Sequence, residues 1–119
     1  MGLDMMLIHD GDEITSWRKA NAIHKWFVDN VQDGVDDCGQ YKVTKEHLIQ
    51  LYNACNDVLN DNNLAESLLP TLIGFFFGSV EYGDGYYYDL RETKNTIDYI
   101  LEYKSYVFED DGLYYYSSW

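Results

Sequence analysis

WRKANAIHKWFVDNV, residues 17–31, is the stretch on which the predicted fold depends. Its apolar residues recur at spacings of three and four, which places them along one stripe of an α-helix. Ser16 is a suitable N-cap, and Gly34 is a suitable stop because glycine adopts the left-handed conformation at little cost. We therefore predict a core helix with a polar outer face, and with His24 and Trp26 at the edges of its apolar stripe. The stripe comprises Trp17, Ala20, Ile23, Phe27, Val28 and Val31, and the outer face comprises Arg18, Lys19, Asn21, Lys25 and Asp29.

Two further main helices are predicted downstream. Thr44 is placed to cap a helix over residues 45–60, where apolar residues again recur at helical spacing. A single helical turn is predicted at 65–69, before a proline. A third main helix is predicted at roughly 87–104, with polar and apolar residues on opposite faces.

The two ends of the chain predict a small sheet. Residues 1–8 and 113–119 are mostly apolar, and each is bounded by a turn signal, HDGDE after the first and EDDG before the second. We expect these two strands to pair, which closes the domain where its ends meet. The predicted fold class is therefore α+β, with three main helices and a small antiparallel sheet pairing the two termini. A chain of 119 residues is predicted to form one acidic domain, 1–119.

The balance of charges disfavours some classes of partner. The sequence holds 21 Asp or Glu against 8 Lys or Arg, a formal net charge of −13. Direct binding to DNA or RNA is disfavoured because phosphates must be neutralised by cations. Adsorption to an anionic membrane is disfavoured for the same reason. The charge permits binding to a basic protein surface or imitation of a nucleic acid, and solubility alone also accounts for it.

No cofactor, metal or membrane segment is predicted. Cys38 and Cys55 lack CxxC spacing, which favours reduced thiols in a cytosol over a disulfide framework. No apolar run reaches the length of a membrane span, and the opening MGLDMMLI is too short for a signal peptide and lacks its basic flank. No second histidine lies three or four residues from His24, so its helix offers no metal-binding pair.

Four groups of acidic residues form the first candidate binding site. A basic partner would be attracted to them if the fold brings them to one face, whereas an even spread over the surface would not support imitation of a nucleic acid. The groups are Asp33, Asp36 and Asp37; Asp84 and Asp89; Glu92, Asp98 and Glu102; and Glu109, Asp110 and Asp111.

A second candidate site lies around His24. Its imidazole could act as a general base or metal ligand, but a partly buried histidine bonded to a carbonyl or a carboxylate is the simpler interpretation. Cys38 follows two carboxylates, which should raise its thiol pKa and argue against a nucleophile. A small-molecule pocket would form if folding gathered these groups near GFFFGS, residues 74–79. Its residues would be Trp17, Arg18, Asn21, His24, Asp37 and Cys38.

The GFFFGS segment itself has two interpretations. Phe75, Phe76 and Phe77 lie between Gly74 and Gly78. Glycines in such a segment are typical of places where two backbones approach closely, which predicts a buried strand or a tight connection. In the other interpretation the glycines present the aromatic rings to a ligand.

Five segments together resemble an uncharacterised family of small bacteriophage and prophage proteins. They are MGLDM, WRKANAIHKWFV, VDDCG, LLPT…GFFFGS…Y and the terminal YYYSSW, which span nearly the whole chain. Members often have tyrosine after MGLDM and Gln-Ser before GFFFG, where this chain has Met6 and Leu72-Ile73. The family brings no catalytic residue with it. The resemblance implies a phage setting and the cytoplasm of a host cell.

The resemblance and the charge together predict a binding protein and not an enzyme. Small acidic phage proteins often inhibit host machinery, so the expected partner is a host protein with a basic nucleic-acid-binding surface, such as a CRISPR nuclease or another defence effector. One alternative is a small-molecule-binding protein or minor enzyme that uses the His24 region. Another is a phage structural or assembly protein, whose tyrosines would serve self-association. The oligomeric state is left open.

Overall fold

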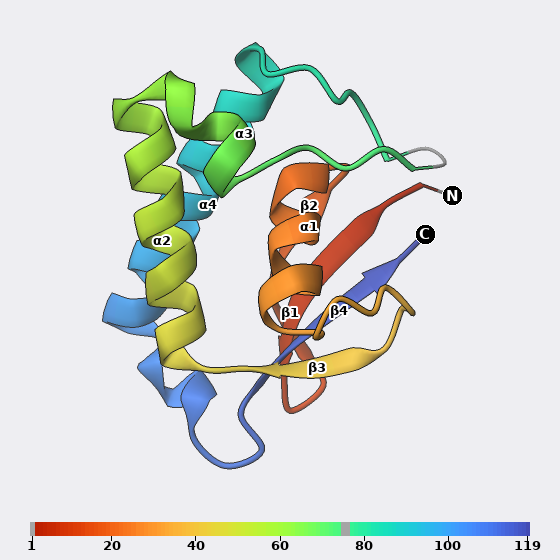
Figure 1. The fold of residues 1–119 in the computed structure, drawn as a ribbon. Helices are drawn as coiled ribbons and strands as arrows, with labels where there is room; N and C mark the ends of the chain where they lie inside the picture. The colour runs from red at the N-terminus through yellow and green to blue at the C-terminus, as the bar shows by residue number, and fades with distance from the viewer. Residues whose placement is uncertain (1, 75–76) are drawn as a thin grey trace.

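The computed structural model describes residues 2–74 and 77–119 and shows the predicted α+β fold, arranged in two layers (Figure 1). Helices form one layer and an antiparallel sheet forms the other. The elements in chain order are β1 (Asp4–His9), β2 (Asp12–Arg18), α1 (Asn21–Asn30), β3 (Gln40–Val43), α2 (Lys45–Asn60), η1 (Asn62–Leu64), α3 (Ala65–Leu68), α4 (Asp84–Tyr103), η2 (Ser105–Phe108) and β4 (Leu113–Ser118).

Within the described residues the sheet has four strands in the order β2-β1-β4-β3. The predicted pairing of the two ends is confirmed, because β1 and β4 run antiparallel at the centre of the sheet, with Asp4 opposite Ser118 and His9 opposite Leu113. Met1 lies outside the described residues. The edge strands β2 and β3 were not predicted, so the sheet is twice as wide as the sequence indicated.

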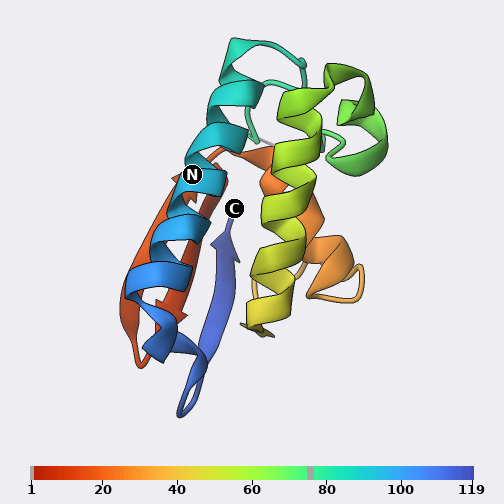
Figure 2. The same ribbon diagram turned by 90° about the vertical axis from the view of Figure 1, so that its left-hand side faces the viewer.

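The helices cover one face of this sheet (Figure 2). Side chains along a strand alternate between faces, and the burial of β1 and β4 follows that alternation. Met5, Leu7, Leu113 and Tyr115 point toward the helices and are fully buried. The residues between them are only half-buried, so the other face of the sheet meets solvent.

The predicted organising helix is four residues too long at its N-terminal end. Ser16, Trp17 and Arg18 belong to β2, and Ala20 occupies the N-cap position of α1 in place of Ser16. Asp10 and Gly11 both have positive φ angles, 50° and 81°, which is the conformation of a tight hairpin turn. The hairpin returns residues 12–18 against β1, where ladder hydrogen bonds satisfy the backbone. Helical spacing alone could not reveal this pairing.

The chain changes direction between β2 and α1 at Lys19. Its φ of 57° is in the left-handed region, and its N–H donates to the carbonyl of Leu3 over 2.8 Å. Helix α1 then runs from Asn21 to Asn30 and is buried on most sides. The prediction that Asn21 faces solvent is therefore wrong, because its side chain is buried. His24, predicted beside the apolar stripe, is buried as well.

Phe27 is the centre of the core, as the apolar stripe predicted. It is fully buried and stacks on Tyr115, with ring centroids 4.0 Å apart and planes 8° from parallel. Trp26 meets the same ring edge-on at 5.3 Å. This aromatic stack joins α1 to the central strand β4, and large rings of this kind supply much of the apolar area buried on folding.

The other two main helices are close to their predicted positions. Thr44 caps α2 as predicted, and His47 completes the cap because its Nδ1 accepts from the Thr44 N–H over 3.0 Å. Helix α4 begins at Asp84, three residues before the predicted start, where a carboxylate in the first turn suits the helix dipole. The predicted helical turn is α3. Phe75 and Phe76 of the GFFFGS segment lie outside the described residues.

Candidate functional site

His24 lies in a buried chain of hydrogen bonds that joins α1, β4 and the loop between α1 and β3. Its Nδ1 is 2.6 Å from the hydroxyl of Tyr115, and its Nε2 is 3.0 Å from each carboxylate oxygen of Asp36. The indole N–H of Trp119 also donates to Asp36 over 3.0 Å. His24 and Tyr115 are fully buried, whereas the Asp36 side chain is 26 % exposed. The chain of bonds therefore runs from the interior to the surface.

The partners of His24 determine its tautomer. A carboxylate only accepts hydrogen bonds, so Asp36 requires a hydrogen on Nε2, and Nδ1 then accepts from the Tyr115 hydroxyl. Burial lowers the pKa of His24, while the hydrogen bond and the charge of Asp36 act in the opposite direction. Burial also holds the pKa of Tyr115 well above its ordinary value. The histidine is therefore neutral and the tyrosine protonated at neutral pH.

This network suits a structural role better than catalysis. A tyrosine, a histidine and a carboxylate in line could relay a proton, but neither Tyr115 nor His24 is accessible to a substrate in this structure. The simpler interpretation of His24, a buried histidine bonded to a carboxylate, matches the geometry. The bonds fix the loop after α1 and the C-terminal Trp119 to the core.

Asp36 and Asp37 point in different directions from the same loop. The carboxylate of Asp37 accepts from the Tyr41 hydroxyl at 2.8 and 2.9 Å and from the Gly39 N–H at 3.0 Å. This hydrogen bond raises the pKa of Tyr41. Cys38, which follows the two acids, is half-buried and has a φ of 59°. Both acids thus hold the loop in shape, which was not evident from their position in an acidic run.

The residues of the predicted pocket are not gathered around His24. Trp17 lies on the inner face of β2 and donates its indole N–H to Thr93 Oγ1 over 2.9 Å. Arg18, the next residue, points to the outer face of the sheet, where its side chain is 72 % exposed and lies 3.9 Å from Asp4. Arg18 and His24 are therefore on opposite faces of the sheet, and Cys38 shares only the loop of Asp36.

Asn21 anchors the segment 72–79 to the start of α1. Its side-chain NH₂ donates to the carbonyls of Phe77, over 3.0 Å, and Ser79, over 2.9 Å. Its carbonyl accepts from the N–H of Leu72 over 3.0 Å. The amide thus replaces a strand partner for residues 72–74 and 77–79, which have no regular secondary structure. The sequence offered no signal of this role, because Asn21 falls on the polar face of the predicted helix.

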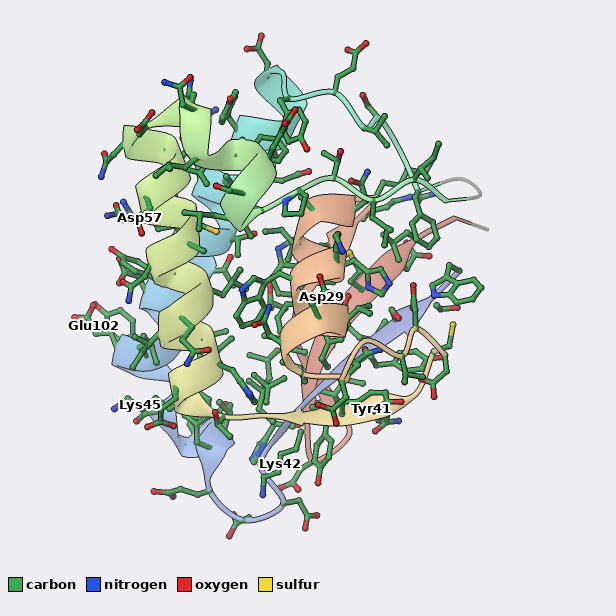
Figure 3. The ribbon with its side chains drawn as sticks, in the orientation of Figure 1. Asp29, Tyr41, Lys42, Lys45, Asp57 and Glu102 are labelled. Atoms are coloured by element: carbon green, nitrogen blue, oxygen red, sulfur yellow. The ribbon has the colours of Figure 1, made fainter. Side chains whose placement is uncertain are left out.

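The four predicted acidic groups do not form one face. Tyr41, the partner of Asp37, and Glu102 project on opposite sides of the molecule (Figure 3). Asp84 and Asp89 are in the first two turns of α4, and Asp33 is in the loop after α1. Glu92, Asp98 and Glu102 follow along α4, and Glu109, Asp110 and Asp111 lie in the turn between η2 and β4.

One end of the molecule combines acids with exposed tyrosines. Tyr99, Tyr103 and Tyr106 are 52 %, 66 % and 48 % exposed, and the first two rings contact each other at 5.3 Å. The turn of the β1–β2 hairpin meets η2 and the η2–β4 turn at the same end (Figures 1 and 2), held by a 3.0 Å hydrogen bond between His9 and the carbonyl of Gly112. The acids of this acid–tyrosine end are Asp10, Asp12, Glu13, Asp98, Glu102, Glu109, Asp110 and Asp111, accompanied by Lys42, Lys45 and Lys104 (Figure 3).

The opposite end of α4 borders a cavity of about 400 Å³ that the sequence did not predict. It lies between the start of α1, the segment around Ser79 and the first two turns of α4. Asp89 is on its wall, and burial raises the pKa of this carboxyl to about 6. The charged residues that line the cavity are Lys19, Glu81, Asp84 and Asp89, and its aromatic residues are Tyr86 and Tyr88.

Within residues 2–74 and 77–119, no three His, Cys, Asp or Glu side chains are arranged to hold a metal ion. None of the helices in these two ranges is long and apolar enough to cross a membrane. Comparisons of the chain with protein-family models, curated proteins and solved structures find no match. The case for a function therefore depends on the surfaces of this fold.

Replacing Asp89 with asparagine is expected to stabilise the protein at neutral pH. The folded-state pKa of about 6 exceeds the ordinary 3.8, so the folded state binds more protons between these values and its stability falls as pH rises through them. Removing the charge should raise the free energy of unfolding at pH 7 by about 1–2 kcal/mol and change little below pH 3.5. Thermal melts at both pH values test this. Asp98→Asn, an exposed site on the same helix, is the control, and equal gains in both variants would contradict the prediction.

Proposed function

We propose that this chain is a non-catalytic binding protein that holds a basic surface of another protein through its acid–tyrosine end. The observation that carries the proposal is the exposure of Tyr99, Tyr103 and Tyr106 among acidic residues. Tyrosine is enriched in protein interfaces because it offers a large rigid ring with a polar tip. Three such rings on one end of a small domain give a partner a place to pack.

The chemistry of this end suits arginine and lysine side chains. A guanidinium can stack on an exposed tyrosine ring, a contact worth about 0.5–2 kcal/mol depending on burial, while a neighbouring carboxylate accepts two hydrogen bonds from it. Glu102 lies three residues after Tyr99 and is exposed on α4, so one arginine could engage a ring and a carboxylate together. The net charge of −13 would also speed the encounter with a basic partner.

The resemblance to phage proteins points to the kind of partner. Such a chain would act in the cytoplasm of a host cell, and the basic surfaces found there are mainly those that bind nucleic acids. The proposed partner is therefore a host nucleic-acid-binding protein, with a CRISPR nuclease or another defence effector as the leading class. A local acidic end supports occlusion of such a surface. The separation of the other acids gives no support to imitation of a whole duplex.

Self-assembly is less well supported by the same surface. Two copies that met through their acid–tyrosine ends would bring like charges together, which opposes association at low salt. A phage assembly role therefore requires another face of the molecule.

Binding to a captured host protein tests the proposal. Tagged protein is incubated with host lysate, bound proteins are eluted with salt, and the affinity of each purified candidate is then measured. We expect Tyr99→Ala with Tyr103→Ala and Glu102→Gln to weaken binding about 100-fold, because two ring contacts and a charged hydrogen bond are lost. Nucleic acid should compete with the wild-type chain for the partner.

Matched variants distinguish an effect specific to the acid–tyrosine end from a general effect of removing a charge or an aromatic ring. Tyr88→Ala removes an equally exposed ring, 56 % accessible, from the other end of α4. Asp57→Asn removes an exposed charge from α2 (Figure 3). Both should bind within about threefold of wild type, a difference of less than 1 kcal/mol. An equal loss in these controls, or binding that does not weaken with added salt, would count against the proposed surface.

A further inference from the structure

The cavity beside α1 and α4 has walls of opposite charge. Lys19 lies on the α1 side, together with the first turn of α1, which has no side-chain cap and contains no acidic residue. Asp84 and Asp89 lie on the α4 side, with Glu81 beside them. A volume of about 400 Å³ between the two walls is enough for a small organic molecule.

Within residues 2–74 and 77–119, the charged groups on these walls form no ion pair with one another. Among the described residues, no salt bridge joins Lys19 to Asp84 or Asp89, and neither aspartate side chain accepts a hydrogen bond. Asp89 is half-buried in this state, and the rise of its pKa to about 6 reflects that loss of solvent. A ligand that offered a cation to Asp89 would recover part of this energetic cost.

The wall between the two charged sides is fixed in place. The two carbonyls held by Asn21 belong to the segment that closes the cavity, at Phe77 and Ser79. Gly78 has a φ of 92°, and a Cβ there would lie 3.0 Å from Cβ of Lys19 and 3.1 Å from its carbonyl oxygen. The segment thus packs directly on the residue that carries the positive charge. This arrangement gives a preformed site and limits the entropy lost on binding.

We propose that this cavity binds a small zwitterion with the chemistry of a free α-amino acid. The ligand carboxylate faces Lys19 and the first-turn amides of α1, and the ligand ammonium faces Asp89 and Asp84. Its side chain lies against Tyr86 and Tyr88, which make the cavity wall partly aromatic. The site is at the end of α4 opposite the acid–tyrosine end, so it goes beyond the proposed binding of a protein partner.

Three probes that share a phenyl group but differ in their charged groups test the inference. L-phenylalanine carries both charges, phenethylamine lacks the carboxylate, and 3-phenylpropanoate lacks the ammonium group. Amide chemical shifts of the full chain are followed by NMR during titration with each. We expect L-phenylalanine to shift the amides of Ala22, Tyr86 and Asp89, and each single-charge analogue to bind at least about tenfold more weakly.

Variants test which wall of the cavity binds the ligand carboxylate and which binds the ligand ammonium. Lys19→Gln should weaken L-phenylalanine about tenfold and leave phenethylamine unchanged. Asp89→Asn should weaken both of these ligands and leave 3-phenylpropanoate unchanged. Glu92→Gln, at an exposed position of α4 that does not line the cavity, should bind all three probes as the wild type does. Equal binding of L-phenylalanine and phenethylamine would overturn the inference in favour of a simple cation site, and no shifts with any probe would overturn it outright.

Discussion

Replacing Asn21 with leucine is expected to cost about 3–4 kcal/mol of stability, among the largest effects of any single change in this chain. Three backbone groups, the carbonyls of Phe77 and Ser79 and the N–H of Leu72, would lose their only described side-chain partner. Each buried backbone group left without a partner costs about 1–3 kcal/mol, and leucine adds apolar volume that offsets only part of this.

Urea denaturation and hydrogen exchange together check the cause of that loss. The Leu72 amide should exchange slowly in the wild type and quickly in Asn21→Leu, while amides in α2 keep their relative protection. Asn95→Leu, at an exposed position of α4, is the control and should change stability by less than about 0.5 kcal/mol. A destabilised variant in which Leu72 stays protected would show that Asn21 does not hold the segment.

Asn21 and Trp17 show why the sequence predicted the fold class better than the details. Trp17 fits two patterns, a helical stripe with Ile23 and Phe27 and an alternating strand opposite Met5. Pairing with β1 decides between them, and that contact is not visible in local spacing. Asn21 was assigned to solvent because a helix usually has one polar face. Leu72, Phe77 and Ser79 contact Asn21 at the start of that face, so the rule did not apply there.

The terminal strands and α2 could be predicted because their signals are local. Alternation and turn residues define β1, and a single capping residue, Thr44, marks where α2 begins. The candidate site depends on contacts over long separations. His24 and Tyr115 are 91 residues apart, and the acids of the β1–β2 turn meet those of the η2–β4 turn only through the fold. No periodicity within either segment predicts these long-range contacts.

Replacing His24 with leucine is expected to destabilise the protein by about 3 kcal/mol and to remove part of its sensitivity to acid. The change leaves the buried hydroxyl of Tyr115 without an acceptor and Asp36 without its main donor. Tyr115→Phe alone should cost about 1 kcal/mol. The double variant should be more stable than the sum of the two losses predicts, because it removes the unpaired hydroxyl along with the histidine. Strict additivity would mean that this hydrogen bond contributes nothing.

The pH dependence of the unfolding free energy distinguishes the titration of His24 from its contribution to packing. Burial lowers the pKa of His24 below 6.5, so the unfolded chain binds more protons than the folded protein between that lowered value and 6.5. Stability from this residue is therefore complete above pH 6.5 and is lost as pH falls through the lowered pKa.

Asp89 acts with the opposite sign between pH 3.8 and about 6, where acid stabilises the folded state. The two effects partly cancel in the wild type, which is why the comparison belongs in an Asp89→Asn background. There, unfolding free energies should fall on acidification below pH 6.5 when His24 is present and fall less when leucine replaces it. Parallel curves for the two proteins would show that His24 does not titrate with folding.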